Sequence, residues 1–322
     1  MRRSLALLAL AGVFVVPAAT FAQAFPANRP IRIVVPNAPG GGADLVARIL
    51  SGRLTERLGQ PVVVDNRGAA GGIVGAEITA KSAPDGHTLM VAVNTHVANP
   101  WLFAKLPYDA LRDFAPVTLA VQSPLVAIIQ SSHPSQNLQE FLAWVRANPG
   151  KTNFGSSGTG SPPHLAGELF KSLGRIDMTH IVYKGIGPAM TSLMGGEIQI
   201  TFGNVFVTLP HVKSGRLRVL GISTARRSEA VPDWPTIAEA GLPGYEASIW
   251  FGIMVPAKTP PAIVARLHKE ITGILNLPEV RQQINASGGD VIAGTTGEFA
   301  REIQLEHERL GRIIRAAGIR VE

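Results

Sequence analysis

Apolar and polar residues alternate along this chain in two different rhythms. Short runs of mostly β-branched and aliphatic residues, such as Ile31–Val35, have the composition of buried strands. Longer stretches, such as residues 43–58, place an apolar residue every three or four positions, which predicts a helix with one buried face. Because the two rhythms follow one another almost throughout, we expect an α/β protein with helices covering a parallel or mixed sheet.

The expected elements fall into two groups along the chain. Strands are expected at residues 31–35, 61–65, 87–93, 117–121, 125–130, 152–154, 178–183, 198–202, 217–223 and 248–255. Helices are expected at residues 43–58, 71–80, 137–147, 162–173 and 188–194. A further helix is expected to end at residue 212, and a short one is expected to begin at residue 232. The last three are expected at residues 260–275, 278–287 and 296–317. A second alternation of strands and helices begins in the middle of the chain, and the last part of the chain is helical without a new sheet. We therefore expect two lobes, a tail that packs back on the first lobe, and a hinge near residues 124 and 248.

The first residues have the features of a secretory leader. A basic start at residues 2–3 precedes an apolar run at 5–16 that is too short to span a membrane. Residues 22–24 read Ala-Gln-Ala, a cleavage pattern that predicts a mature chain beginning at Phe25. An N-terminal anchor helix is the alternative, which the break at Pro17 disfavours. The signal peptide 1–24 would send the protein to the periplasm.

Composition narrows the function further. The chain has no cysteine, so an exported form depends on its core alone for stability. Hydrophobic residues make up 46% and charged residues 16%, which excludes a disordered chain. The net charge of +7 falls by two with the leader, and no basic cluster is interleaved with aromatics. Nucleic-acid binding is therefore not expected, while a mild positive field would attract a small carboxylate.

A strand that runs into a Gly-rich turn and then a helix occurs three times. The turns cover residues 36–44, 155–161 and 184–188. The first turns of the helices that follow present unpaired N–H groups and the positive end of the helix dipole. Together they favour a site that holds an anion without a cofactor or metal. The alternative is that they are ordinary corners of an α/β fold.

Motifs for catalysis or cofactor binding are incomplete. Residues 150–152 read Gly-Lys-Thr, but Val145 replaces the first Gly of a P-loop. Residues 185–187 lack the third Gly of a dinucleotide fingerprint, and Thr159 interrupts a nucleophile-elbow pattern at 155–158. There is no His-Glu-x-x-His pair. We expect a binding protein with no catalytic residue, cofactor or metal.

Several side chains near the first two turns have two possible roles. Asp44 suits the first turn of its helix as a cap, or it could hydrogen-bond a ligand, and Arg48 is expected to pair with it. Ser161 is a candidate N-cap before a helix that starts with proline. Ser156 and Ser157 could donate hydroxyls to a carboxylate or only shape a tight turn.

Other candidates follow predicted strand ends. His164, after the Gly/Ser turn, is either structural or a ligand hydrogen-bonding group. Lys184 could pair with an anion or remain solvated. Asn94 and Thr95, and Asn204 further on, come after strands whose ends would line an α/β site.

Many segments, in order, resemble one known family. They are residues 29–36 with 39–41 and 44, 58–67, 84–89, 107–109 with 113–114, 148–151, 155–158 with 164–165, 183–185 with 188–189, 227–228, 232–233, 235–236 with 239–241, and 243–246. Across essentially the whole mature chain, this resembles the Bug family, the extracytoplasmic solute receptors of tripartite tricarboxylate transporters. The family often has Tyr at the place of His87 and Pro-Gly at the place of residues 68–69, departures that leave the turns intact.

The resemblance implies a type II periplasmic binding protein fold. Residues 25–124 and 249–322 would form the first lobe and 125–248 the second, closing on a small organic carboxylate. The receptor would deliver it to integral membrane permease subunits, and a monomer is the default. The turns at 37–41 and 156–161 would grip the carboxylate, partly through water, while 204–208 would select the far end. The expected ligand-binding set is Asn37, Ala38, Pro39, Gly40, Gly41, Asp44, Asn94, Thr95, Ser156, Ser157, Gly158, Ser161, His164, Lys184, Gly187, Pro188, Ala189 and Asn204.

Three other functions remain open. The protein could present its ligand to a sensor kinase instead of a permease. It could be a secreted hydrolase or lyase that uses His164 with a serine. It could also be an exported interaction protein whose cleft is vestigial.

Overall fold

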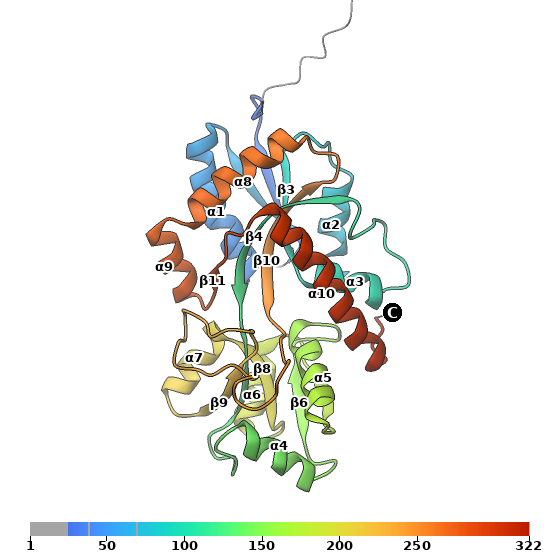
Figure 1. The fold of residues 1–322 in the computed structure, drawn as a ribbon, viewed down its shortest axis with the longest axis vertical. Helices are drawn as coiled ribbons and strands as arrows, with labels where there is room; N and C mark the ends of the chain where they lie inside the picture. Colours follow the sequence, from blue (N-terminus) through green and yellow to red (C-terminus); the bar gives the residue numbers. More distant parts are fainter. Residues whose placement is uncertain (1–24, 38, 69, 322) are drawn as a thin grey trace, which may run out of the picture.

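The computed structural model describes residues 25–37, 39–68 and 70–321. The expected leader, its cleavage site and Ala38 lie outside the described residues. Two sheets follow one another along the long axis of the molecule, each covered by helices (Figure 1). We call the upper sheet with its helices the first lobe and the lower sheet with its helices the second lobe.

The first lobe has a six-stranded sheet in the order β11-β4-β10-β3-β1-β2. Its strands are β1 (Ile31–Val35), β2 (Val62–Asn66), β3 (Thr88–Val93), β4 (Phe114–Ser123), β10 (Ile249–Pro256) and β11 (Asp290–Val291). Its helices are α1 (Gly42–Leu58), α2 (Ile73–Ala80), α3 (Thr95–Leu102), α8 (Pro261–Leu275), α9 (Pro278–Ala286) and α10 (Thr296–Ala316), with a short 3₁₀ helix η1 (Ala70–Gly72).

The second lobe has a five-stranded sheet in the order β7-β6-β8-β5-β9. Its strands are β5 (Leu125–Gln130), β6 (Asn153–Ser156), β7 (Thr179–Val182), β8 (Ile200–Asn204) and β9 (Leu217–Ile222). Its helices are α4 (Leu138–Ala147), α5 (Pro162–Gly174), α6 (Ile186–Gly195) and α7 (Val205–Lys213).

The two sheets repeat one arrangement. The strand series β2-β1-β3-β10-β4 in the first lobe corresponds to β7-β6-β8-β5-β9 in the second. In each, the fourth strand runs antiparallel to both neighbours, and it is a strand that the chain enters by crossing from the other lobe. Pro124 alone separates β4 from β5, while β10 begins the return.

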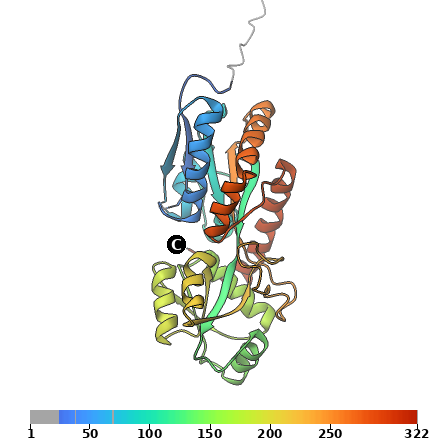
Figure 2. The ribbon, with the colours of Figure 1, turned by 90° about the vertical axis from the view of Figure 1, so that its left-hand side faces the viewer.

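Strand direction decides which edges face each other. Strands β1 to β4 all run toward the crossing at Pro124, because β10 opposes both β3 and β4. Strand β5 leads away from this crossing, and β6 to β9 run back toward it. The carboxyl ends of the parallel strands of both lobes therefore lie at the edges that the two sheets turn toward one another (Figure 2).

Apolar side chains fill both faces of each sheet. Along β1 and β3, alternate residues pack against α1 and α8, while the residues between them in β3 join the side of α3 and α10. On the side of α3 and α10, the rings of Trp250 and Phe299 pack edge to face with their centroids 5.4 Å apart. In the second lobe, Phe141, Phe170 and Phe202 are fully buried. Each such side chain contributes about 1.5–3 kcal/mol through burial, so the fold does not require disulfides.

Three sequence expectations differ from the structure. The short helix expected from residue 232 is wrong: Pro232 lies in a turn, Pro235 lies in irregular backbone, and Ile222 forms a bridge with Thr236. Helix α3 was not expected, since Pro100 lies inside it. The tail does add a strand, β11, which pairs with β4.

The tail helix α10 reaches further than expected. It packs on α3 and β4 of the first lobe, as predicted, and its later part also contacts α5 of the second lobe. Among the described residues, no helix combines the length and apolar character needed to cross a membrane.

Candidate functional site

The structure places most of the predicted site residues at the two facing edges. In the first lobe, Pro39–Gly41 follow β1, and Asn94 and Thr95 follow β3. In the second lobe, residues 157–161 follow β6, Lys184 follows β7, and Asn204 ends β8. Because the carboxyl ends of these strands face the other lobe, residues far apart in sequence share one interlobe region.

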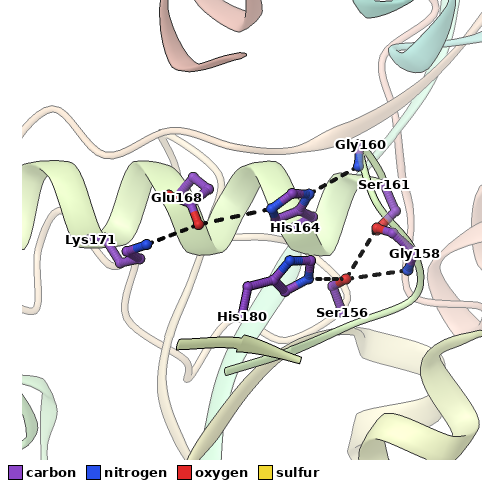
Figure 3. Close-up of polar contacts among 8 residues, drawn as sticks. All are labelled: Ser156, Gly158, Gly160, Ser161, His164, Glu168, Lys171 and His180. Carbon is purple, nitrogen blue, oxygen red and sulfur yellow. Dashed lines mark hydrogen bonds and ion pairs between the residues drawn. The ribbon is translucent and has the colours of Figure 1, made fainter. Parts of the chain in front are cut away.

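The second-lobe turn is held by its own side chains (Figure 3). Ser156 Oγ lies 2.6 Å from His180 Nε2 and accepts the N–H of Gly158 at 3.2 Å. Ser156 is fully buried, so its hydroxyl is not free for a ligand as the sequence suggested. Ser161 occupies the N-cap position, but its Oγ donates to the Gly158 carbonyl at 2.6 Å rather than accepting a helix N–H. Ser157 remains half-buried.

His164 supports the same turn from the first turn of α5. Its Nδ1 accepts the N–H of Gly160 at 3.0 Å, and its ring stacks on His180 with centroids 3.7 Å apart. Burial, followed by the charges of His180 and Lys171, lowers the pKa of His164 to about 3. Burial likewise lowers the pKa of His180 to about 4. The imidazole pair is therefore neutral near pH 7, and His164 holds the backbone of the turn.

Asp44 plays the matching part in the first-lobe turn. Its carboxylate accepts the Gly40 N–H at 3.0 Å, the Arg48 guanidinium at 2.9 Å and the Asn66 amide at 3.0 Å. The Arg48 hydrogen bond is the main reason that the pKa of Asp44 falls to about 2. The predicted Asp44–Arg48 pair is confirmed. Asn37 Oδ1 is buried without a hydrogen-bond partner among the described residues.

The remaining candidates lie in different settings. Asn94 is buried and donates its amide to the Ser248 carbonyl at 3.1 Å, which ties the end of β3 to the start of the return strand. Thr95 is the first residue of α3. Asn204 caps α7 by accepting the Val207 N–H at 3.0 Å.

The third turn is only partly open. Lys184, Gly187 and Pro188 are exposed at the edge of the second lobe. Ala189 is fully buried in α6, with its Cβ packed toward Gly155 of β6. It therefore packs against the strand behind the turn and does not line an open site.

Sequence reasoning missed two glycines at these edges, and it included Phe206 only within the stretch 204–208 that was expected to select the ligand's far end. Phe206, at the start of α7, has 65% of its surface exposed, the largest exposed fraction of the large apolar side chains described. Gly71 and Gly72 follow β2 with φ of 62° and 88°. The Gly-Gly pair was a visible signal for a tight turn, whereas the exposure of Phe206 could not be read from an apolar run.

Comparison with known proteins identifies the family. The sequence model described as "Tripartite tricarboxylate transporter family receptor" matches residues 46–319. The chain belongs to this family. Protein BugT of Bordetella pertussis is 36% identical over 322 residues, which cover 98% of each chain.

Solved structures of similar proteins confirm the predicted fold. R. palustris Rpa4515 with adipate is 30% identical with a TM-score of 0.79, over 92% of this chain and 100% of that one. MatC from Rhodopseudomonas palustris with bound malate is 33% identical with a TM-score of 0.75, over 90% and 100%. The protein has the two-lobed periplasmic binding protein fold of this receptor family, and both family and fold are those of solute-binding receptors.

The candidate site differs in place from a cavity found in the structure. A cavity of about 830 Å³ lies between α5 and α10, with Lys171, Arg309 and Arg312 among its lining residues. It is at the flank, beside the far end of α5 rather than at the facing edges. We place the candidate site at the edges, because the Gly-rich turns and the helix starts that follow them gather there.

The interior contacts argue against hydrolysis by a serine of this turn. Ser156 and His180 have the spacing of a nucleophile and its base, but Ser156 is fully buried. His164 has its Nδ1 occupied by Gly160, while its Nε2 faces Glu168 at 3.9 Å. Among the described residues, no group of three His, Cys, Asp or Glu side chains could hold a metal ion.

Proposed function

We propose that this receptor captures a small organic carboxylate between its lobes and delivers it to the membrane permease of a tripartite tricarboxylate transporter. One observation carries the proposal: two Gly-rich turns of similar construction open α1 and α5 at the facing edges of the two sheets. Relatives with bound adipate and malate support the same class of ligand.

In this proposal, backbone N–H groups donate most of the hydrogen bonds to the carboxylate. Helix starts present N–H donors and a partial positive charge to an anion. Ser157 and Lys184 lie at the second-lobe edge, where a hydroxyl and an ammonium group add to the donors. Contacts made only when both lobes meet the ligand would favour the closed form over the open one.

The location and partners belong to the same proposal. Residues 1–24 act as a leader cleaved after Ala24, and the mature chain works in the periplasm, where receptors of this family act. The partner is an integral membrane permease, and the receptor is a monomer without nucleic-acid partners. Presentation of the ligand to a sensor kinase is a second use of the same binding event.

A binding screen of the mature chain from Phe25 onward tests the proposal. Thermal shift against malate, adipate and a panel of other carboxylates, followed by calorimetry, should yield one saturable site. A ligand at 100 times its Kd adds about 2.7 kcal/mol to stability. Shifts from neutral or amine compounds alone would contradict the carboxylate class. Consumption of the compound would favour an enzyme.

A further inference from the structure

The cavity of about 830 Å³ on the flank of the molecule, which we call the flank cavity, has walls from both lobes. The later half of α5, in the second lobe, forms one wall. The last turns of α10, the tail helix of the first lobe, form the other, and Figure 1 shows this end of α10 beside α5. Small-molecule sites have volumes of about 300–1,000 Å³, so the flank cavity is large enough to be one.

Apolar side chains line much of the flank cavity. Leu169 and Leu173 come from α5, Ile176 follows the end of that helix, and Ile313 comes from α10. Leu173 has 38% of its surface exposed, and the other three are half-buried. An occupant with an apolar body would remove these surfaces from water, which is favourable.

The carboxylates that line the flank cavity already have cationic partners. Glu168 pairs with Lys171 at 3.1 Å, and Glu246 pairs with Arg309 at 3.0 Å. Arg309 also contacts two carboxylates of α10 that do not line the cavity, so its positive charge is balanced within the protein. The attraction of the cavity for a charged ligand therefore depends on its remaining charged side chains.

Two arginines of the flank cavity lack such partners. Arg175 follows the end of α5 and Arg312 lies on α10, so they belong to opposite walls. Both are exposed, and neither side chain forms a hydrogen bond or an ion pair with another residue that the structure describes. Backbone carbonyl groups in the last turns of both helices accept hydrogen bonds from other donors. The two guanidinium groups are therefore available to an anion.

The backbone at Arg175 gives a second indication. This residue has φ of 49° and ψ of 50°, the left-handed conformation that side chains with a Cβ disfavour. Glycine is the usual residue at such a helix end, yet Gly174 lies one position earlier, inside the helix. Strained positions of this kind cluster at functional sites. An arginine where glycine would fit without strain indicates a use for its side chain.

We propose that the flank cavity is a second binding site, which takes an amphipathic anion with a carboxylate head and an apolar body. Arg175 and Arg312 would bind the head, because a guanidinium group matches the planar geometry of a carboxylate. Leu173 and Ile313 would cover the body. The site is separate from the interlobe edges and does not depend on the proposed receptor function. Because α5 and α10 belong to different lobes, its occupant contacts both lobes at once.

Straight-chain monocarboxylates test the chemistry of the site. Calorimetry of the mature chain with hexanoate, octanoate and decanoate should show saturable binding that tightens by up to about fourfold for each added methylene group. Acetate lacks the apolar body and 1-octanol lacks the charge, so each should bind at least about tenfold more weakly than octanoate. Affinity that does not depend on chain length, or does not depend on the charge, would overturn the proposal.

Variants of the lining residues locate the binding. Arg175→Gln and Arg312→Gln should each weaken octanoate binding about threefold to tenfold, because each removes one charged donor. Ser172→Phe fills space at an exposed position of the α5 wall and should weaken it about tenfold or more. Arg301→Gln, at an exposed position of α10 outside the cavity, removes the same charge and should leave the affinity within about twofold. Wild-type affinity in the first three variants would overturn the proposal.

Competition separates the flank cavity from the interlobe edges. Octanoate should still bind when adipate or malate is present at saturation, and its binding should still depend on Arg312. Complete displacement by either acid, with no effect of Arg312→Gln, would place octanoate at the interlobe edges and overturn the proposal. If octanoate binds as expected while no other carboxylate does, the receptor function fails and the second site stands. If adipate or malate binds while octanoate does not, the second site fails and the receptor function stands.

Discussion

The first-lobe and second-lobe turns rest on different kinds of support. Asp44 holds its turn through ionic hydrogen bonds to Gly40, Arg48 and Asn66. In the second lobe, two stacked neutral imidazoles and one buried hydroxyl do the same work. Similar backbone geometry can thus be stabilised by a charged acceptor or by neutral ones. The two turns should therefore respond differently to added side-chain volume, to pH and to substitution.

The space around the two turn glycines gives the largest expected difference. A Cβ on Gly160 would lie 2.9 Å from Leu102 Cδ1, whereas one on Gly40 would meet nothing within 4 Å. Gly160→Val should cost about 3 kcal/mol of unfolding free energy, from the left-handed backbone plus overpacking. Gly40→Val should cost about 1–2 kcal/mol, from the backbone alone. Denaturant unfolding of both variants checks this, and equal costs would contradict the packing difference.

Acid should weaken the second-lobe support before the first. The pKa of His164 is about 3 in the fold against 6.5 in the unfolded chain, so its stabilisation is complete above pH 6.5 and is lost as pH falls toward 3. For Asp44, the loss begins only below about pH 3.8 and runs toward pH 2. The slope from one imidazole is at most about 1.4 kcal/mol per pH unit.

The matched variant His164→Asn isolates this pH effect. Its unfolding free energy should vary less than that of the wild type between pH 6.5 and 4.5, because one titrating imidazole has been removed. Asp44→Asn should leave the slope in that range as it is. Parallel curves for the wild type and His164→Asn would show that the imidazole does not titrate as the structure requires.

Removal of the buried carboxylate should have a moderate cost. Asp44→Ala removes the buried carboxylate that accepts hydrogen bonds from the Gly40 N–H, the Arg48 guanidinium and the Asn66 amide. We expect a loss of about 1–3 kcal/mol in unfolding free energy, because hydrogen bonds to a charged acceptor are lost. Arg53→Ala, which removes an ion pair of 3.5 Å with the exposed Glu279, is the control and should change stability by less than about 1 kcal/mol. Equal losses in the two variants would show that Asp44 contributes no more to stability than an exposed surface charge does.

Phe206 should give the smallest effect on stability. Since 65% of its surface is exposed, Phe206→Ala should change the unfolding free energy by about 0.5 kcal/mol or less. If it contacts the far end of the ligand, the variant should alter the order of affinities among carboxylates of different length. An unchanged order of affinities, measured by calorimetry, would show that Phe206 does not contact the ligand.

Local patterns predicted the elements better than they predicted the contacts. The strand-turn-helix junctions and the Asp44–Arg48 pair could be predicted because each depends on neighbours in sequence. The burial of Ser156 could not, since its partner His180 comes from the adjacent strand β7. The repeated topology was also hidden, because each sheet takes its antiparallel strand from a distant part of the chain.

The most direct test of capture between the lobes is a distance measured across them. The double variant Pro39→Cys/Thr159→Cys, spin-labelled at both positions, reports the separation of the two turns by pulsed electron spin resonance. Saturation with the carboxylate that most stabilises the mature chain should shorten and narrow the distance distribution. An unchanged distribution at saturating ligand would contradict the account, because binding would then occur without closure of the two turns.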